Sequence, residues 1–495
     1  MTMPPTTAPR IRWFTKEARQ QIVDEAKGIL EEIGVFVENE QALALLSGAG
    51  CRIDSPRRQV QIPAALVERA VAGAPSRILL YDRHSQVAMD LAEDRVHFNP
   101  GSAALRIYDP QEGRARTPVT VDLVRFVTLV DALPHYAAQS TGLISGDVPQ
   151  EIADRYRLYL ALLFGTKPVV TGTFRVDGFA PMCEMLAAIA GGPEQLRAKP
   201  NAIFDCCPSP PLKWSDLTTQ ALIDCARCGI VAELISMPLT GATAPVTLAG
   251  AVTQHCAECL SGVVIHQLAQ PGAPIIYGGS PACFDMRKGT TPMGAVETMM
   301  IDGAYAEIGK HLGLPTQAYM GLSDAKTVDF QAGMESAMGV TIAALSGINN
   351  VSGPGMLDFE SCQSLEKLVL DHEICGSVLR LARGIELRED PIVGLDLMRQ
   401  GIDRKSFLPL AHTKQWFRQE AYFPADVIDR NVLDEWQRQG SKDAAHRATE
   451  RVEKLIEVHR SEPLEATIAT HLREVMEAEA HKFGMEKLPE LPLRN

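Results

Sequence analysis

Residues 202–237 read AIFDCCPSPPLKWSDLTTQALIDCARCGIVAELISM and contain the unit that decides the fold. The apolar run Ala202–Cys206 is followed by an amphipathic stretch, Leu217–Cys228, which Gly229 closes. A second apolar run, Val231–Met237, comes next. Two short runs joined by a helix predict parallel neighbouring strands, because parallel pairing needs a crossover connection of this length.

The same unit recurs along most of the chain. The predicted strands are Val96–Asn99, Ala137–Leu143, Val169–Phe174, Ala202–Cys206, Val231–Met237, Pro274–Gly279, Thr316–Met320 and Asn350–Gly353. The predicted helices between them are Val121–Ala132, Ile152–Phe164, Met182–Ala190, Leu217–Cys228, Leu248–Leu268, Ala295–Leu312 and Gln331–Ser346. An open doubly wound sheet would need a glycine-rich phosphate turn after an early strand, and none fits. The pattern therefore predicts an α/β fold, a (β/α)8 TIM-type barrel.

Two flanking regions differ from this pattern. Residues 1–90 alternate short strands and helices and predict an N-terminal α/β cap. Residues 91–390 hold the predicted catalytic barrel, and residues 391–495 hold charged helical segments, Val432–Val458 and Pro463–Phe483. We expect this C-terminal extension to wrap the barrel or to form an oligomer contact, which makes the chain a predicted homo-oligomer.

Composition narrows the class of protein. The 495 residues are 46% hydrophobic and 22% charged, as expected of a globular chain with a large core. A net charge of −13 without a basic stripe argues against a nucleic-acid partner. Met1–Arg10 is polar and does not resemble a signal peptide, and every long apolar stretch is interrupted, so no membrane span is expected. These features predict a cytoplasmic protein.

Eleven scattered cysteines predict reduced thiols rather than a disulfide framework. Two pairs, Cys225/Cys228 and Cys256/Cys259, have the spacing of a zinc knuckle. Both pairs fall within predicted helices, where residues three apart share a face. Buried helix cysteines are therefore favoured over bound zinc, although the metal alternative stays open.

Chemistry in a parallel barrel lies on the loops after the strands. These loops show no His-x-His pair, no cluster of Asp and Glu, and no Ser with His and Asp partners, so neither a catalytic metal nor a triad is predicted. Aromatic residues remain, and their faces bind alkylated ammonium groups. The predicted substrate-binding residues are Phe98, Phe174, Tyr277, Ser280, Tyr319, Gln331, Glu335 and Asn349.

Plainer interpretations stay open for several of these residues. Tyr277 and Tyr319 also suit ordinary barrel packing, and the run Ser323–Lys326 also suits a turn that caps the next helix. Glu233 is unusual, because a charge within a barrel strand is costly unless it is paired or neutralised. It faces either a bound cation and a polar layer or an outer helix.

Several motifs resemble the trimethylamine:corrinoid methyltransferase family. They are GLSDAK at 321–326, continued by DFQAGME at 329–335, CPSPPL at 207–212, ISMPLTG at 235–241, PVTLAG at 245–250 and FDMRKGT at 284–290. The resemblance extends nearly end to end, from Phe14 to Asp443. It implies a (β/α)8 barrel and methyl transfer from an amine to the Co(I) of a corrinoid (cobalamin-type) cofactor held by a separate protein.

The resemblance also assigns roles to residues. The founding enzymes carry pyrrolysine where this chain has Leu322, so the chain is similar to the non-pyrrolysine branch, whose known members demethylate quaternary amines such as glycine betaine. The implied catalytic positions are Leu322, Ser323, Asp324 and Lys326. Arg287 and Lys288 are candidates for contact with a betaine carboxylate or with the corrinoid.

No Asp-x-His-x-x-Gly corrinoid-ligand motif occurs, since Asp371-His372 lacks the intervening residue. The chain is therefore predicted to hold no cofactor of its own and to meet a corrinoid-binding partner protein. Two alternatives stay open: a methyltransferase that passes the methyl group directly to a folate, and a non-catalytic betaine-binding relative.

Overall fold

The fold is known from a computed structural model, which describes residues 8–492. Eight parallel strands form its centre: β6 (His97–Phe98), β9 (Gln139–Ser140), β10 (Val169–Thr171), β11 (Ala202–Cys206), β13 (Val231–Leu234), β15 (Ile275–Ile276), β17 (Gln317–Tyr319) and β18 (Asn350–Ser352). Each lies within one of the eight predicted runs. Residues 1–7, most of the segment considered above as a signal peptide, lie outside the described part.

The strands follow one another in chain order. One sheet runs β15-β13-β11-β10-β9 and a second runs β17-β18-β6, with every pair parallel. Single parallel bridges, Phe98–Tyr136 and Tyr277–Thr316, connect the two sheets. The last strand thus pairs with the first, in a TIM-barrel-like α/β arrangement.

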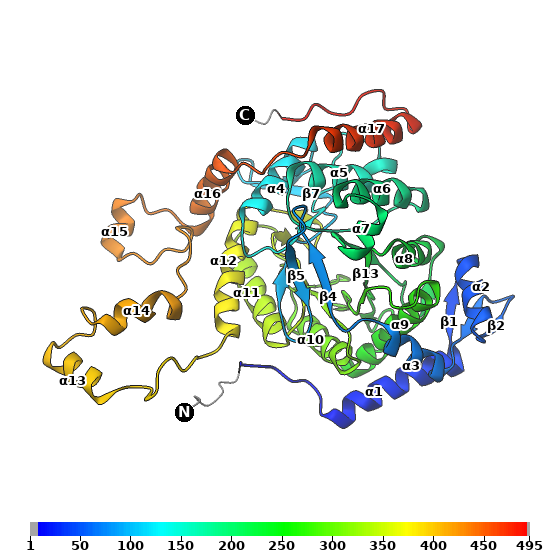
Figure 1. Ribbon diagram of the computed structural model, residues 1–495, viewed down its shortest axis with the longest axis horizontal. Coiled ribbons are helices and arrows are strands. Elements are labelled where there is room, and N and C mark those ends of the chain that lie inside the picture. Colours follow the sequence, from blue (N-terminus) through cyan, green and yellow to red (C-terminus); the bar gives the residue numbers. More distant parts are fainter. Residues whose placement is uncertain (1–7, 493–495) are drawn as a thin grey trace.

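Helices cover the outside of the strands (Figure 1). They are α4 (Thr120–Ala132), α5 (Ala153–Phe164), α6 (Phe179–Ala190), α8 (Asp216–Cys228), α9 (Leu248–Ala269), α10 (Val296–His311), α11 (Phe330–Leu345) and α12 (Leu365–Ala382). All four residues of β13 are buried, as expected of a parallel strand with side chains covered on both faces. The seven predicted helices are confirmed, and α12 adds an eighth.

Helix α9 is long and apolar enough to cross a membrane. Within this fold, however, 78% of its most apolar window is buried, against the strands and the neighbouring helices α1, α3 and α8. The helix therefore has the surroundings of a core helix.

The N-terminal region packs beside α8 and α9, and its last hairpin covers the amino end of the strands. It comprises α1 (Lys16–Gly28), a π-helical turn (Ile29–Ile33), β1 (Val35–Val37), α2 (Glu40–Gly48), β2 (Arg52–Asp54), β3 (Gln59–Gln61), α3 (Ala64–Gly73), β4 (Ile78–Tyr81) and β5 (Val87–Leu91). The β4–β5 hairpin packs Leu80 and Met89 against Val170, Ile203 and other strand residues. This end is sealed, which leaves the carboxyl end for a site.

The loops after the strands build small sheets at the carboxyl end. β7 (Arg106–Asp109) and β8 (Arg114–Arg116) join β19 (Met356–Leu357) and β20 (Cys362–Gln363), and β14 (Leu239–Thr240) pairs with β16 (Ala282–Cys283). β12 (Lys213–Trp214) instead pairs with β1, so one loop reaches back to the N-terminal region. Short helical turns, η2 (Gln150–Ile152), η3 (Val176–Gly178) and α7 (Pro193–Ala198), complete the loops.

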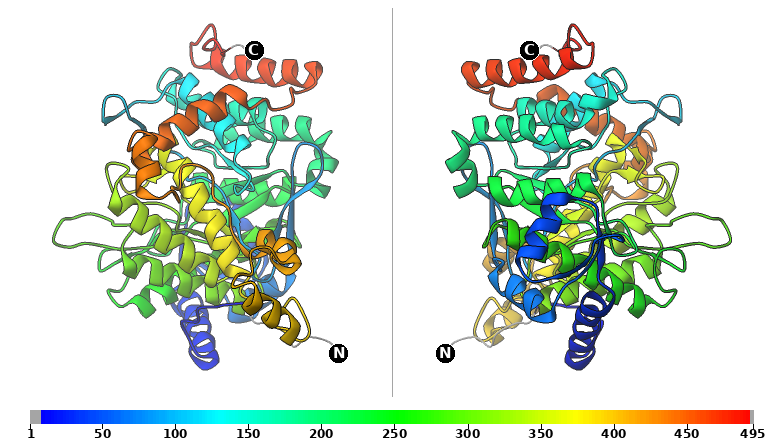
Figure 2. Two further views of the ribbon diagram at one scale, coloured as in Figure 1. Left: turned by 90° about the vertical axis from the view of Figure 1, so that its left-hand side faces the viewer. Right: turned by 90° about the vertical axis from the view of Figure 1, so that its right-hand side faces the viewer.

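The C-terminal region has two parts. Helices α16 (Ala444–Val458) and α17 (Ala466–Lys482) pack against α4, α12, α5 and α6. Before them, residues 384–443 form an extended segment, which we call the arm, with α13 (Leu395–Asp403), α14 (Ala411–Glu420) and α15 (Leu433–Arg438). The arm stands away from the body in Figure 1, at the left of the view. In Figure 2 it overlaps the body, with its gold part, around α13, at the lower edge.

Candidate active site

Two carboxyl groups face each other inside the strands. Asp205 of β11 and Glu233 of β13 are partners in the parallel register. Glu233 is buried and Asp205 is half-buried, and Glu233 Oε2 and Asp205 Oδ1 are buried atoms without another hydrogen-bond partner among the described residues. Burial raises the pKa of Asp205 to about 6, and burial and the charge of Asp205 raise the pKa of Glu233 well above its usual range. Both shifts favour the protonated forms, and the shift is the larger for Glu233.

A chain of hydrogen bonds runs across the strands toward Asp205. Asn99 Nδ2 donates to Asn350 Oδ1 at 2.7 Å, and Asn350 Nδ2 donates to Glu233 Oε1 at 2.8 Å. From the other side, the Tyr319 hydroxyl donates to Asp205 Oδ2 at 3.2 Å. The donors of Asn99, Asn350 and Tyr319 therefore all point toward the Asp205–Glu233 pair.

This pair bears on one prediction. The expectation that acids do not cluster was made for the loops after the strands, and it did not consider the strands themselves. Asp205 and Glu233 lie within strands rather than after them, and they form a pair only because the strands are in register. Glu233 faces the interior polar layer, which was one of the two orientations left open.

A third carboxyl group lies close to the pair. Glu360 follows Asp358 and Phe359 in the turn between β19 and β20, and all three residues have positive φ, from 52° to 68°. Three successive non-glycine residues in this region are strained, and such strain is held where the surroundings impose it. Burial and the charge of Asp205 raise the pKa of Glu360 to about 8.

One cation accompanies these acids. Arg157 of α5 is buried and donates to the carbonyls of Thr141 and Gly172, each at 3.1 Å. Its guanidinium lies 4.3 Å from the ring centre of Phe174. Burial lowers the pKa of Arg157 to about 10, so it stays charged and partly balances Asp205.

The predicted residues after β17 form a second network beside the first. Ser323 Oγ and the Asp324 amide donate to Glu335 Oε2 at 2.5 and 2.8 Å, and Gln331 donates to Glu335 Oε1 at 2.9 Å. The Asp324 carboxylate accepts the amides of Met293 and Gly294. Burial raises the pKa of Asp324 to about 6.

A cavity of about 760 Å³ opens onto this network. Asp324, Lys326, Gln331, Glu335 and Arg287 line it, together with Phe359 of the strained turn. Lys326 Nζ lies 3.8 Å from the ring centre of Phe359 and 3.1 Å from an Asp358 oxygen. The turn that carries Glu360 therefore separates the cavity from the Asp205–Glu233 pair.

Other predicted residues lie around these networks. Ser280 is buried after β15, and its amide bonds the Ser236 carbonyl. Arg287 is exposed and paired with Asp285 at 3.1 Å, and Lys288 is exposed in the same turn. Leu322 is buried in the main core, directly before the Ser323 network.

Three predicted residues lie elsewhere. Phe98 lines a different cavity, with His97 and His135 near the amino ends of the strands. Tyr277 points outward and packs on His255 of α9 and Tyr305 of α10. Asn349 bonds the carbonyls of Ala92, Glu93 and Arg95 at the amino end. The structure does not bring these three to the carboxyl end.

The two cysteine pairs and Asp371-His372 lie within helices. Cys225 and Cys228 lie on α8, and Cys256 and Cys259 lie on α9, all as free thiols. Within residues 8–492, no three His, Cys, Asp or Glu side chains are grouped to hold a metal ion. Asp371 is paired with Lys367 and His372 with Glu373, both within α12.

Sequence reasoning missed Asp205, Glu360, Arg157 and Asn350 as members of a site. A signal existed for the first, since Asp205 and Glu233 occupy the same place in two successive, otherwise apolar strands. Arg157 lies in a helix and Glu360 in a turn after the last strand, so only the folded chain brings them to the pair.

Fold and site together define an α/β enzyme with a TIM-barrel-like fold and an acidic, partly aromatic site at the carboxyl ends of its strands. The trimethylamine methyltransferase (MTTB) family model matches residues 2–484. The chain belongs to this family and is a methyltransferase.

Individual relatives agree with this assignment. The chain is 31% identical to trimethylamine methyltransferase MttB of Methanosarcina barkeri (strain Fusaro), over 94% of both chains. It is 29% identical to MttB of Desulfitobacterium hafniense (strain DCB-2), over 96% of this chain and 95% of that one. It is also 29% identical to a glycine betaine methyltransferase of Desulfitobacterium hafniense (strain Y51), over 88% and 91%.

A solved structure supports the fold. The crystal structure of the Methanosarcina barkeri monomethylamine methyltransferase (MtmB) superimposes with a TM-score of 0.55, over 95% of this chain and 88% of that one. The sequence identity is 12%, so this likeness concerns the fold alone.

Proposed function

We propose that the chain moves a methyl group from a small quaternary amine, glycine betaine or a related betaine, to the Co(I) of a corrinoid carried by a separate protein. The observation that carries this proposal is the half-buried Asp205 carboxyl group, which accepts the Tyr319 hydroxyl and lies beside the Asn99–Asn350–Glu233 hydrogen bonds. A fixed negative charge next to an aromatic ring suits a ligand that is a permanent cation.

The reaction needs little acid–base catalysis from the protein. A quaternary ammonium loses a methyl group to leave a neutral tertiary amine, so no proton has to be supplied. The nucleophile on the partner takes the methyl group, and the nitrogen keeps the electron pair of the broken C–N bond. The protein then has to hold the methyl carbon in line with the nucleophile, which is a matter of positioning.

Leu322 favours the branch without pyrrolysine. Its side chain is buried and apolar at the place where the resemblance puts pyrrolysine. The relative named glycine betaine methyltransferase is similar over 91% of its length, which supports a quaternary substrate. We propose that Ser323 and Asp324 position this loop through Glu335, rather than react.

A betaine also carries a carboxylate. Lys326 is the candidate to bind this carboxylate, because its ammonium group lies over the Phe359 ring and both residues line the cavity. Arg287 and Lys288 are exposed at the outer side of the same region, where they can meet the partner protein. Phe174, stacked on Arg157, completes the proposed aromatic surroundings.

We further propose that the eight strands form one closed barrel, which the bridges Phe98–Tyr136 and Tyr277–Thr316 support. The division into a cap (1–90), a barrel (91–390) and an extension (391–495) stays a prediction, and β12 ties the first part to the second. The cytoplasmic location likewise stays a prediction.

A methyl-transfer assay tests the function. The purified protein is mixed with a Co(I) corrinoid and glycine betaine, other betaines, choline or trimethylamine, and formation of methyl-Co(III) is followed by absorbance. We expect methylation with at least one quaternary amine. Transfer to tetrahydrofolate without corrinoid, or tight betaine binding with no turnover beside a competent corrinoid protein, would contradict the proposal.

A further inference from the structure

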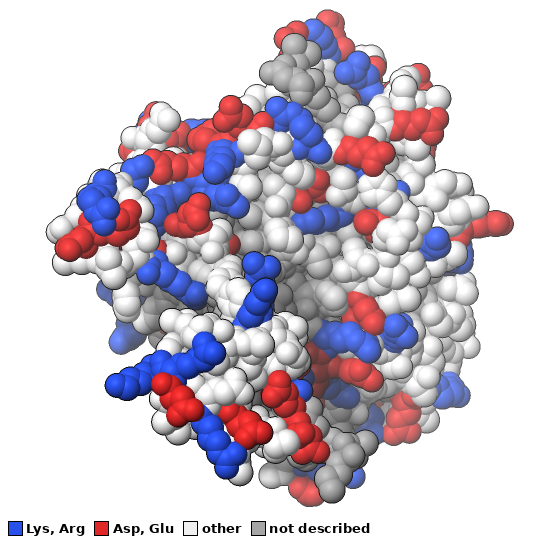
Figure 3. Space-filling model, turned by 60° about the vertical axis from the view of Figure 1, so that its left-hand side comes forward, with Lys and Arg blue, Asp and Glu red and all other residues white. Residues whose placement is uncertain are grey.

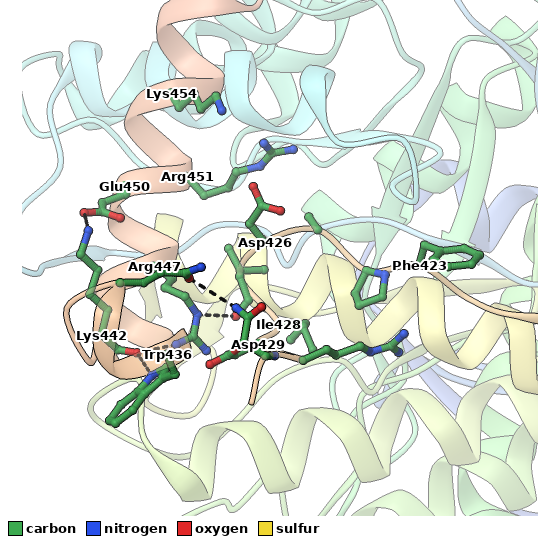
Figure 4. Close-up of a pocket in the computed structure, with 16 residues that line it drawn as sticks. Phe423, Asp426, Ile428, Asp429, Trp436, Lys442, Arg447, Glu450, Arg451 and Lys454 are labelled. Carbon is green, nitrogen blue, oxygen red and sulfur yellow. Dashed lines mark hydrogen bonds and ion pairs between the residues drawn. The ribbon is translucent and has the colours of Figure 1, made fainter. Parts of the chain in front are cut away.

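Cavities away from the active-site end differ in what lines them. A groove of about 670 Å³ lies between residues 423–431 of the arm and α16, and charged side chains such as Asp426 and Arg451 line it (Figure 4). Groups of both signs are interspersed with uncharged surface on this side of the molecule (Figure 3). A second cavity, of about 750 Å³, is lined mainly by apolar side chains and contains two thiols, Cys183 and Cys228. The second cavity therefore offers thiol chemistry where the first offers charge.

The second cavity, which we call the thiol pocket, lies between α6 and α8 on the outside of the strands. These helices pack against each other and against α7 (Figure 1). Cys183 lies in the second turn of α6, and Cys228 is the last residue of α8. Both thiols are free and partly exposed, and Val176, Phe179 and Ala187 line the same pocket. Two thiols from different helices thus share one pocket that small uncharged molecules can enter.

The two thiols change each other's acidity. The neighbouring Cys183 thiol lowers the pKa of Cys228 to about 7, and Cys228 together with burial raises the pKa of Cys183. At pH 7 about half of Cys228 is therefore a thiolate, against roughly 3% of an ordinary cysteine. The thiolate is the form that reacts with oxidants and alkylating agents, so Cys228 is the nucleophile of the pair.

A cation at the end of α8 favours the same ionised form. Arg197 of α7 packs against Gly229, the residue after Cys228, where a Cβ atom would lie 2.7 Å from Arg197 Cγ. Its guanidinium donates to the carbonyl of Arg227, the residue before Cys228, at 2.6 Å. A partly exposed thiol beside a positive charge is the usual setting of a reactive cysteine.

The other charged groups at the pocket leave this arrangement in place. Asp224, one turn earlier on α8, raises the pKa of Cys228, but by less than Cys183 lowers it. Glu184 of α6 is paired with His471 of α17 at 3.2 Å. Cys225 is the contrasting case, because it is fully buried and burial raises its pKa well above the ordinary range. The partner of Cys228 is therefore Cys183, and not Cys225 with its zinc-knuckle spacing.

We propose that Cys183 and Cys228 form a modification site, a dithiol that hydrogen peroxide converts to a disulfide and that thiol reductants restore. The Cys228 thiolate attacks one oxygen of the peroxide, the O–O bond breaks, and hydroxide leaves and takes up a proton to form water. The Cys183 sulfur then attacks the sulfur of the Cys228 sulfenic acid. The S–O bond breaks, and hydroxide leaves with the Cys183 proton as a second water. Two thiols are oxidised to one disulfide, and one peroxide is reduced to two waters.

The site lies on the part of the chain that carries the active-site acids. Helix α8 connects β11, with Asp205, to β13, with Glu233. The disulfide would close a loop of residues 183–228 that contains β11. The modification therefore restrains the segment that carries Asp205, while the thiols themselves lie outside the strands.

The test uses the full chain, reduced, freed of reductant and treated with a small excess of hydrogen peroxide at pH 7. Alkylation and peptide mass spectrometry follow. We expect the loss of two thiols per chain and a pair of peptides joined through Cys183 and Cys228, which dithiothreitol separates. A folded wild type that forms no such disulfide, or that first joins other cysteines, would overturn the proposal.

Three variants separate the steps. Cys183→Ser should stop at the sulfenic acid of Cys228, which dimedone traps, and Cys228→Ser should form neither product. Cys225→Ser, on the same helix, is the matched control and should oxidise like the wild type. Trapping of the sulfenic acid on Cys183 instead of Cys228 would contradict the assigned roles.

Alkylation of the wild type needs no variant and tests the nucleophile. The rate at which iodoacetamide modifies Cys228 should rise with pH around a midpoint near 7. At pH 7 the thiolate fraction should be about tenfold above that of an ordinary cysteine. A midpoint at or above about 8.5, the value of an unperturbed thiol, would overturn the proposal.

Discussion

The two ends of the strands are built for different purposes. At the amino end, Asn349 and Lys310 are fully bonded to backbone carbonyls and to each other, and the β4–β5 hairpin covers the strands. At the carboxyl end, Asp205, Glu233 and Glu360 lie close together with pKa values raised by burial. At the amino end the polar side chains named here are hydrogen bonded, which stabilises the fold. At the carboxyl end, acidic side chains lie where burial raises the free energy of their charged forms, which stability does not require.

The largest expected effect comes from Asp205→Asn. Removing the fixed negative charge should lower methyl transfer by about 100- to 1,000-fold, as when a preorganised electrostatic group is lost. The melting temperature should not fall, because burial raises the Asp205 pKa and its ionised form therefore disfavours folding above pH 6. Steady-state kinetics and thermal unfolding measure the two effects.

Asp302→Asn is the matched control for that variant. Asp302 is also a buried acid with a raised pKa, but it lies on α10, outside both networks. Its activity should equal that of the wild type. Equal loss of activity in both variants would remove Asp205 from the site.

Two adjacent residues sharpen the comparison of the ends. Asn349→Ala should lower the free energy of unfolding by about 1–3 kcal/mol, because the buried Ala92 carbonyl and the part-buried carbonyls of Glu93 and Arg95 lose their donor, with little change in kcat. Asn350→Ala removes the donor to Glu233 and should lower kcat about tenfold. Urea unfolding should show the larger loss of stability for Asn349→Ala, and steady-state kinetics should show the larger loss of kcat for Asn350→Ala. A shared pattern would mean that the ends do not differ in role.

Tyr319→Phe should have a smaller effect. The ring stays and the hydroxyl that donates to Asp205 is lost, so kcat/KM should fall about three- to tenfold, the value of one hydrogen bond of ordinary strength, as its length of 3.2 Å suggests. Tyr277→Phe is the control, since Tyr277 packs on α9 and α10. No difference between the two variants would place Tyr319 outside the substrate contacts.

The smallest expected effect is that of Lys326→Met. If Lys326 binds the betaine carboxylate, KM for glycine betaine should rise about two- to fivefold, the value of a partly exposed ion pair. KM for choline, which has no carboxylate, should stay unchanged. An equal change for both substrates would assign Lys326 to the loop rather than to the carboxylate.

The sequence predicts the fold of this molecule better than it predicts the residues of the active site. Strand runs such as Val231–Met237 and the helices between them are marked by local patterns, so their order and parallel pairing could be predicted. The Asp205–Glu233 pair was missed: the matching positions of the two acids in successive strands hinted at it, but only the register between the strands makes them partners. Tyr277 and Phe98 were assigned to the site from position alone, yet alternate residues of a strand point to opposite faces.

The Ser323–Glu335 network is the part of the site that local sequence does indicate. Its members lie within thirteen residues, at a strand end and on the first turns of α11, and the folded chain bonds them directly. The exposure of the arm, in contrast, could not be predicted from local sequence. Its helices look like ordinary amphipathic helices, and only the fold shows that their apolar stripe is left uncovered.

The pH dependence of substrate binding tests the central claim most directly. A cation beside Asp205 and Glu360 favours their ionised forms, so binding should release protons and tighten as pH rises from 5 to 8, through Asp205 up to about pH 6 and through Glu360 up to about pH 8. The gain is up to about tenfold for each unit by which one pKa is lowered. Calorimetric titration with glycine betaine, in two buffers of different ionisation enthalpy, measures both quantities. The account predicts proton release and tighter binding at the higher pH. Proton uptake, or an affinity that does not change across this range, would contradict it.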